Sequence, residues 1–141
     1  MRQTTRALDE RELERKIDKA LELRKAGETE QPVTILSTIF EEIPANDLRR
    51  LGLVGSLLRE AGELSKALYC FDKAVESNPL SPRASLGRFH SLWRSGRYDE
   101  AFDELERFLS VAESEAHSML LEDTRQEFWR ESGNKVKDPY Y

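Results

Sequence analysis

The side chains that can carry catalytic or metal chemistry are few and far apart in this sequence. The chain contains one cysteine, Cys70, and two histidines, His90 and His117. Catalytic and zinc sites combine several histidine, cysteine and carboxylate groups, and no CxxC pair, HExxH motif or glycine-rich phosphate loop occurs here. We therefore predict a protein that is not an enzyme and uses no metal or cofactor. Cys70 is expected to be a small helix residue rather than a nucleophile.

Carboxylates are numerous, but their arrangement does not suggest a catalytic pair. They concentrate in YDEAFDELE, residues 98–106, and in LEDTRQE, residues 121–127. Closely spaced acidic residues on a helix are typical of a solvated polar face. We expect these carboxylates to face water.

Arginine is the remaining group that could bind a ligand. Residues 47–97 hold 9 basic and 5 acidic side chains, against 8 and 10 in residues 1–46 and 5 and 12 in residues 98–141. A guanidinium fork suits carboxylate partners. The net charge of −5 argues against non-specific binding to nucleic acid or to an anionic membrane. The arginines of the middle segment are Arg49, Arg50, Arg59, Arg83, Arg88, Arg94 and Arg97.

The elements that position these arginines follow from an internal repeat. The segment GELSKALYCFDKAVESNP at 62–79 recurs as GRYDEAFDELERFLSVAE at 96–113, and more faintly as GETEQPVTILSTIFEEIP at 27–44. Apolar residues in each segment recur at helical spacing, and a glycine opens each segment. Helices are predicted at about 9–26, 31–43, 46–60 and 64–77, then from Pro82 with Ser81 as N-cap, from Tyr98, and at about 115–131.

The best-defined unit resembles a tetratricopeptide repeat (TPR), which has a similar period. The matching residues are Val54, Gly55, Leu58, Gly62, Ala67, Phe71, Ala74 and Pro79. The resemblance implies an all-α, right-handed α-solenoid over residues 8–131, followed by a polar tail at 132–141. It would consist of three TPR-like helix pairs, about 13–46, 48–81 and 82–113, and a C-terminal capping helix at 115–131. The third unit departs from the pattern, because Arg88 and Phe89 replace the usual leucine and small residue.

The resemblance also implies a binding groove, because the first helix of each pair lines the concave face in this family. Transferred to this chain, the partner-binding positions are Arg49, Leu53, Arg59, Arg83, Leu86, His90, Trp93 and Arg94. The groove would bind an acidic or C-terminal peptide with one or two apolar side chains. Trp93 has a second interpretation, as a core residue packed on a neighbouring helix. The lysine and asparagine clamp that some members use for chaperone tails is absent.

These features predict a non-catalytic protein–protein interaction module. The alternatives are a dedicated inhibitor, such as an immunity protein, or a secretion chaperone for one partner; an RNA-binding accessory is more distant. A second copy of the chain, or its tail, could also fill the groove. The absence of an apolar leader, of a membrane-spanning run and of a cysteine pair favours a cytoplasmic protein.

Overall fold

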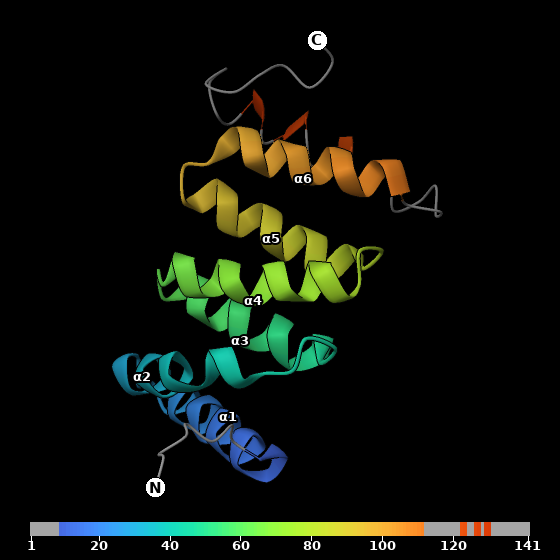
Figure 1. Cartoon of the computed structure of the whole chain (residues 1–141). Helices are drawn as coiled ribbons and strands as arrows, with labels where there is room; N and C mark the ends of the chain where they lie inside the picture. The colour runs from blue at the N-terminus through green and yellow to red at the C-terminus, as the bar shows by residue number, and fades with distance from the viewer. Residues whose placement is uncertain (1–8, 112–121, 124–125, 128, 131–141) are drawn as a thin grey trace, which may run out of the picture.

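The described part of the chain is built from helices joined by short turns, as the sequence predicted. The computed structural model describes residues 9–111 and, further on, residues 122–123, 126–127 and 129–130. Residues 9–111 form six α-helices and one short 3₁₀ turn, with no strand among them (Figure 1). The elements are α1 (Glu10–Lys25), α2 (Glu30–Ile39), η1 (Phe40–Glu42), α3 (Leu48–Glu60), α4 (Leu64–Ser77), α5 (Pro82–Arg94) and α6 (Tyr98–Val111).

The helices follow one another along the molecule in chain order. In Figure 1, α1 lies at one end of the described fold and α6 at the other. Extensive contacts join α1 to α2, α3 to α4, α4 to α5 and α5 to α6, and α5 also packs on α3. A short turn joins the two helices of each pair. The last pair is connected to α3 and α4 through α5.

Three glycines end the first helix of each pair in the same way. Gly27, Gly62 and Gly96 have φ of 89°, 85° and 78°. After α3, the Gly62 amide donates to the Arg59 carbonyl and the Glu63 amide donates to the Leu58 carbonyl, which is the paired bonding of a Schellman motif. The same two bonds follow α1 and α5. The recurring glycine of the sequence repeat is thus a recurring backbone turn.

Helix starts are fixed by short polar side chains. Asp9, Asp47 and Ser81 accept a hydrogen bond from the amide three residues on, at the starts of α1, α3 and α5. The Ser81 cap followed by Pro82 was predicted and is confirmed. Pro32 lies in the first turn of α2, where its missing N–H costs no hydrogen bond.

One helix boundary differs from the prediction, and one predicted helix lies mostly outside the described residues. The predicted helix at 31–43 ends as α2 at Ile39 and continues only as the 3₁₀ turn η1. The predicted capping helix at 115–131 lies mostly outside the described residues, although residues 122–123, 126–127 and 129–130 are helical. The tail at 132–141 lies wholly outside them.

The core is divided into two apolar clusters. One runs through α1 to α4 and includes Ile17, Leu36 and Leu58, while the other joins α5 to α6 around Phe89 and Phe108. The ring of Phe71 on α4 lies between the two parts. A Cβ added at Gly87 on α5 would stand 2.1 Å from Phe71 Cε1, and one added at Gly55 on α3 would stand 2.9 Å from Cε2. The two glycines therefore allow one ring to fill the space between α3 and α5.

No helix in residues 9–111 or in the short described pieces beyond them has the length and apolar character required to cross a membrane.

Candidate functional site

The predicted partner-binding residues all lie on α3 and α5, which pack against each other. They do not share one environment. Arg49 is tied to α1, Trp93 belongs to the aromatic core, and the others form what we call the α3–α5 face. This face consists of Leu53, Arg59, Arg83, Leu86, His90 and Arg94.

Arg49 is engaged in ion pairs that join α1 to α3. Its Nη2 lies 3.2 Å from Glu14 Oε1, and the same carboxylate oxygen accepts a 2.6 Å bond from Nη2 of the buried Arg50. The hydrogen bond from Arg50, then the charges of both arginines, lower the pKa of Glu14. Arg24 and Glu60 form a further pair, at 3.0 Å, between the same helices. The arginines between α1 and α3 are therefore balanced by Glu14 of α1 and Glu60 of α3.

Arg59, Arg83 and Arg94 are different, because none of them forms an ion pair with a described residue. Arg59 is half-buried. Its guanidinium carbon lies 5.8 Å from the centroid of the Phe71 ring, a distance at which a cation is attracted to the ring face. Burial, followed by the charge of nearby Arg94, lowers the pKa of Arg59. The charge of Glu60 offsets part of this shift, but Glu60 forms its ion pair with Arg24.

His90 lies beside this arginine pair. Burial and then the positive charge of Arg59 lower the pKa of its imidazole, and its ring meets Phe89 edge-on at 5.5 Å. Both causes favour the neutral imidazole at neutral pH. A positive charge on this imidazole is therefore disfavoured, and an anion nearby would offset the charge of Arg59.

Apolar surface lies next to these charges. Leu53 and Leu86 are half-buried and pack on the edges of the two core clusters. A small depression between the start of α3 and the start of α5 is lined by Gly52, Phe71 and Arg83, among others. A ligand on this face would therefore meet leucine side chains as well as arginines.

Trp93 is chiefly a core residue. Its ring centroid lies 4.5 Å from Tyr98, 5.7 Å from Phe102 and 6.0 Å from Phe89. Phe89 stands where the second unit has Gly55, and it is fully buried between α5 and α6. The Phe89 ring packs against Phe102 and Trp93, and these side chains form one aromatic cluster. Of its two interpretations, the structure favours the core.

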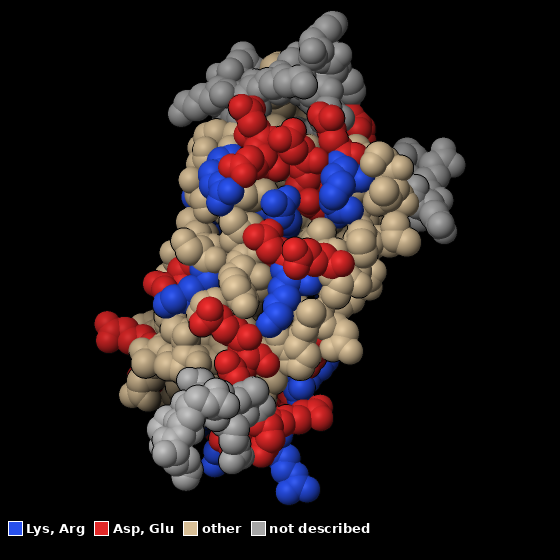
Figure 2. Space-filling view, in the orientation of Figure 1, with Lys and Arg blue, Asp and Glu red and all other residues tan. Residues whose placement is uncertain are grey.

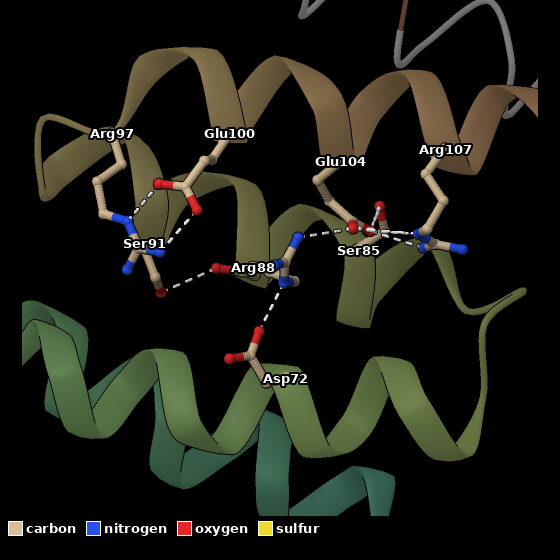
Figure 3. A network of polar contacts seen from close by, with 9 residues as sticks. Asp72, Ser85, Arg88, Ser91, Arg97, Glu100, Glu104 and Arg107 are labelled. Carbon is tan, nitrogen blue, oxygen red and sulfur yellow. Dashed lines mark hydrogen bonds and ion pairs between the residues drawn. The ribbon is translucent and has the colours of Figure 1, made fainter.

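A second polar group of side chains joins α4, α5 and α6 (Figure 3). Arg88 on α5 points between its neighbours, with Nε 2.5 Å from Asp72 Oδ1 on α4 and Nη1 3.0 Å from Glu104 Oε1 on α6. Glu104 also accepts a 2.8 Å bond from Ser85 Oγ and a 2.6 Å bond from Arg107 Nη2. The unusual arginine of the third unit is thus explained by this network.

The expectation that the acidic residues of 98–106 face water is wrong at Glu104. Its side chain is only 1 % exposed, whereas the neighbouring Asp103 and Glu106 are exposed. The ionised carboxylate tolerates burial because three side chains donate to it. Its spacing of three residues from Arg107 was visible in the sequence, but its bonds to Ser85 and Arg88 were not.

The face drawn in Figure 2 carries interleaved acidic and basic groups, with acidic atoms gathered over α6. The acidic residues of α6 include Asp99, Glu100, Asp103 and Glu106. The pairing of Glu100 with Arg97, at 2.6 Å, is one of the exposed ion pairs on this helix. Charge on this face is balanced over most of its length, unlike the arginines of the α3–α5 face.

The remaining candidates for chemistry are the metal-ligating side chains and Cys70. Among the described residues, no group of three or more histidine, cysteine, aspartate and glutamate side chains is placed to hold a metal ion. Cys70 is buried in the core cluster of α1 to α4. Its burial raises the pKa of the thiol to about 12.

We expect Cys70 to react slowly with thiol reagents. Because the thiolate is the reactive species and the thiol pKa is raised to about 12, alkylation at pH 8 should be at least about 100-fold slower in the native protein than in guanidinium chloride. Mass spectrometry of iodoacetamide-treated protein measures both rates. Comparable rates in the two conditions would contradict the burial of this side chain.

Comparison of the chain with protein-family models and with curated proteins finds no match. The functional interpretation therefore depends on the side chains of the α3–α5 face.

Proposed function

We propose that this protein is a non-catalytic interaction module that binds an anionic segment of a partner protein on its α3–α5 face. We further propose that its helices form a right-handed, TPR-like solenoid in which α1, α3 and α5 line the concave side. The repeated Schellman turns and the packing of α5 on both α3 and α4 support this architecture. In such a stack the first helix of each pair presents its exposed face to the ligand.

The main support for this function is the half-buried Arg59, which has no carboxylate partner among the described residues. This side chain is half-buried, lies over Phe71 and is close to Arg94, yet no described carboxylate pairs with it. By contrast, ion pairs with acidic side chains engage the arginines at the contact between α1 and α3, namely Arg24, Arg49 and Arg50. A ligand carboxylate between Arg59 and Arg94 would relieve their mutual repulsion and form charge-assisted hydrogen bonds.

The ligand is expected to contain an apolar side chain near its acidic group. Leu53 and Leu86 are half-buried beside the arginines, and burying a leucine-sized side chain contributes about 1.5–3 kcal/mol. Arginine is enriched among the residues that contribute most to binding at protein interfaces.

The test is peptide binding by paired charge variants. Synthetic peptides that place a leucine among aspartates should bind the wild type better than the same peptides with lysines. Arg59→Glu/Arg94→Glu should weaken this binding more than tenfold, since each charge-assisted bond is worth about 1.5–3 kcal/mol. Arg15→Glu/Lys19→Glu makes the same charge change on exposed positions of α1 and should bind as the wild type does.

His90 provides an independent readout. A carboxylate placed beside Arg59 should raise the pKa of His90, because it offsets the charge that lowers this pKa in the free protein. NMR titration of the imidazole with and without peptide measures the change. An unchanged pKa in the complex, or equal binding by both charge variants, would refute the proposed site. Competition by polyuridylate that weakens steeply with added salt would instead indicate RNA binding.

A further inference from the structure

A second cleft lies at the N-terminal end of the helix stack, between α2 and α3 (Figure 1). It is lined by the α1–α2 turn, the first turns of α2 and the end of α3, and we call it the α2–α3 cleft. Its volume of about 650 Å³ lies within the range of about 300–1,000 Å³ that is typical of ligand sites. Helix α2 has 10 residues, against 14 in α4, and it contacts α3 less extensively than α4 contacts α5. Part of α3 therefore remains uncovered here.

The floor of the α2–α3 cleft is apolar. It consists of Pro32 and Leu36, which are buried, and of Val33 and Leu57, which are half-buried. Val33 and Leu57 pack against the core cluster of α1 to α4 but keep part of their surface in contact with water. An aliphatic side chain placed here would remove this apolar surface, and its own, from water, which is favourable. The floor therefore suits a side chain of the size of valine or leucine.

The rim of the α2–α3 cleft carries a negative charge that is not balanced. Its charged side chains are Arg24, Glu28, Glu30 and Glu60, and all four are exposed. Arg24 and Glu60 form an ion pair at 3.0 Å and balance each other. Glu28 accepts a 3.4 Å bond from the neutral Gln31, and neither Glu28 nor Glu30 forms an ion pair with a described basic residue. The start of a helix stabilises such carboxylates but leaves their charge available to a cation.

We propose that the α2–α3 cleft binds an extended segment of a partner protein in which an aliphatic side chain stands between two basic residues. Successive side chains of an extended segment point to opposite sides. When the aliphatic side chain enters the floor, its two neighbours therefore point outward. Long lysine or arginine stems then bring their charged ends to the rim, where Glu28 and Glu30 lie. The positive charge of this segment disfavours the arginine-rich α3–α5 face as its binding site, and the inference does not depend on the function proposed for that face.

The experiment titrates the isotope-labelled full-length chain with the synthetic peptide GSKLKSG, acetylated and amidated to remove its terminal charges. Peptide-induced NMR shifts should saturate and should be largest at the amides of Val33, Thr34, Leu57 and Ala61, which line the cleft. The peptide GSKSKSG lacks the leucine and should bind at least about fivefold more weakly. The peptide GSELESG reverses the charge and should cause no saturable shift at these amides.

A pair of charge variants separates docking from general charge attraction. Glu28→Gln/Glu30→Gln should weaken the binding of GSKLKSG at least about threefold, because it removes two exposed ion pairs. Asp18→Asn/Glu22→Gln makes the same charge change on exposed positions of α1 and should bind the peptide as the wild type does. Equal losses in the two variants would overturn the proposal, since the peptide would then respond only to net charge.

A pair of bulky variants tests the position of the peptide. Ala61→Trp places a large side chain in the cleft from an exposed position after α3 and should abolish binding. Ser95→Trp makes the corresponding change at the exposed position after α5 and should leave binding unchanged. Equal binding of GSKLKSG and GSKSKSG, or no saturable shift with either, would overturn the proposal. Shifts of the same amides on raising the protein concentration without peptide would place a second copy in the cleft and would also overturn it.

Discussion

Gly87→Ala is expected to destabilise the protein by about 3 kcal/mol. The added methyl group would stand 2.1, 2.3 and 2.6 Å from three carbons of the Phe71 ring. Gly87 and Phe71 are both buried, so the ring can move away only by separating α4 from α5. The gain in helix propensity, about 1 kcal/mol for glycine to alanine, does not offset this clash. Urea denaturation followed by circular dichroism measures the difference.

Gly52→Ala is the matched control for that experiment. Gly52 lies inside α3, and a Cβ added there would meet nothing within 4 Å. This variant should be as stable as the wild type or more stable by up to about 1 kcal/mol. Combining Gly87→Ala with Phe71→Leu should cost less than the sum of the two single changes, because the smaller side chain relieves the clash. Additive losses would show that the two residues are not in contact.

Glu104→Ala is expected to cost about 3 kcal/mol of the free energy of unfolding. The change leaves the buried Ser85 hydroxyl without its partner and removes the carboxylate shared by Arg88 and Arg107. The two arginines are 27 % and 32 % exposed, so water recovers part of their loss. Glu100→Ala removes an exposed pair with Arg97 from the same helix and should cost less than about 1 kcal/mol. Thermal and urea unfolding of both variants provide the comparison.

The network also allows a test by replacement. Arg88→Leu/Glu104→Leu removes both charges and restores an apolar residue at the position where the second unit has Val54, which is fully buried. Such replacements of buried ion pairs are often neutral or stabilising. The double variant should therefore recover the part of the stability that Glu104→Ala loses through Arg88, whereas Ser85 lacks its partner in both variants. If it is less stable than Glu104→Ala, the network does not act as described.

The features that the sequence predicted are those with a local cause. The helix start at Ser81 depends on residues within one turn, and the structure confirms it. The glycine that opens each repeated segment also acts within one turn, and in the structure it ends the helix before it. The early end of α2 was missed, since its last turn tightens to a 3₁₀ turn at Phe40 without a glycine or proline before it. The α-helical class and the order of the elements followed from the same local signals.

The side-chain pairs between helices were not predictable from spacing. Glu14 meets Arg49 and Arg50, and Glu104 meets Ser85 and Arg88, because of how each helix is rotated about its axis. That rotation is set by the packing of the whole stack. The repeat did place the candidate arginines on α3 and α5, but it could not show which of them already have acidic partners. It also gave no sign that Phe71 supports Arg59.

The position of the Phe71 ring has an evolutionary consequence. The same ring separates Gly55 from Gly87 and carries the guanidinium of Arg59 on its face. Under the function proposed above, few substitutions at residue 71 would change partner binding without also changing the stability of the fold. Divergence of partner choice in a lineage of such proteins would then proceed through Leu53, Leu86 and Arg94, whose side chains border the face without filling the space between α3 and α5.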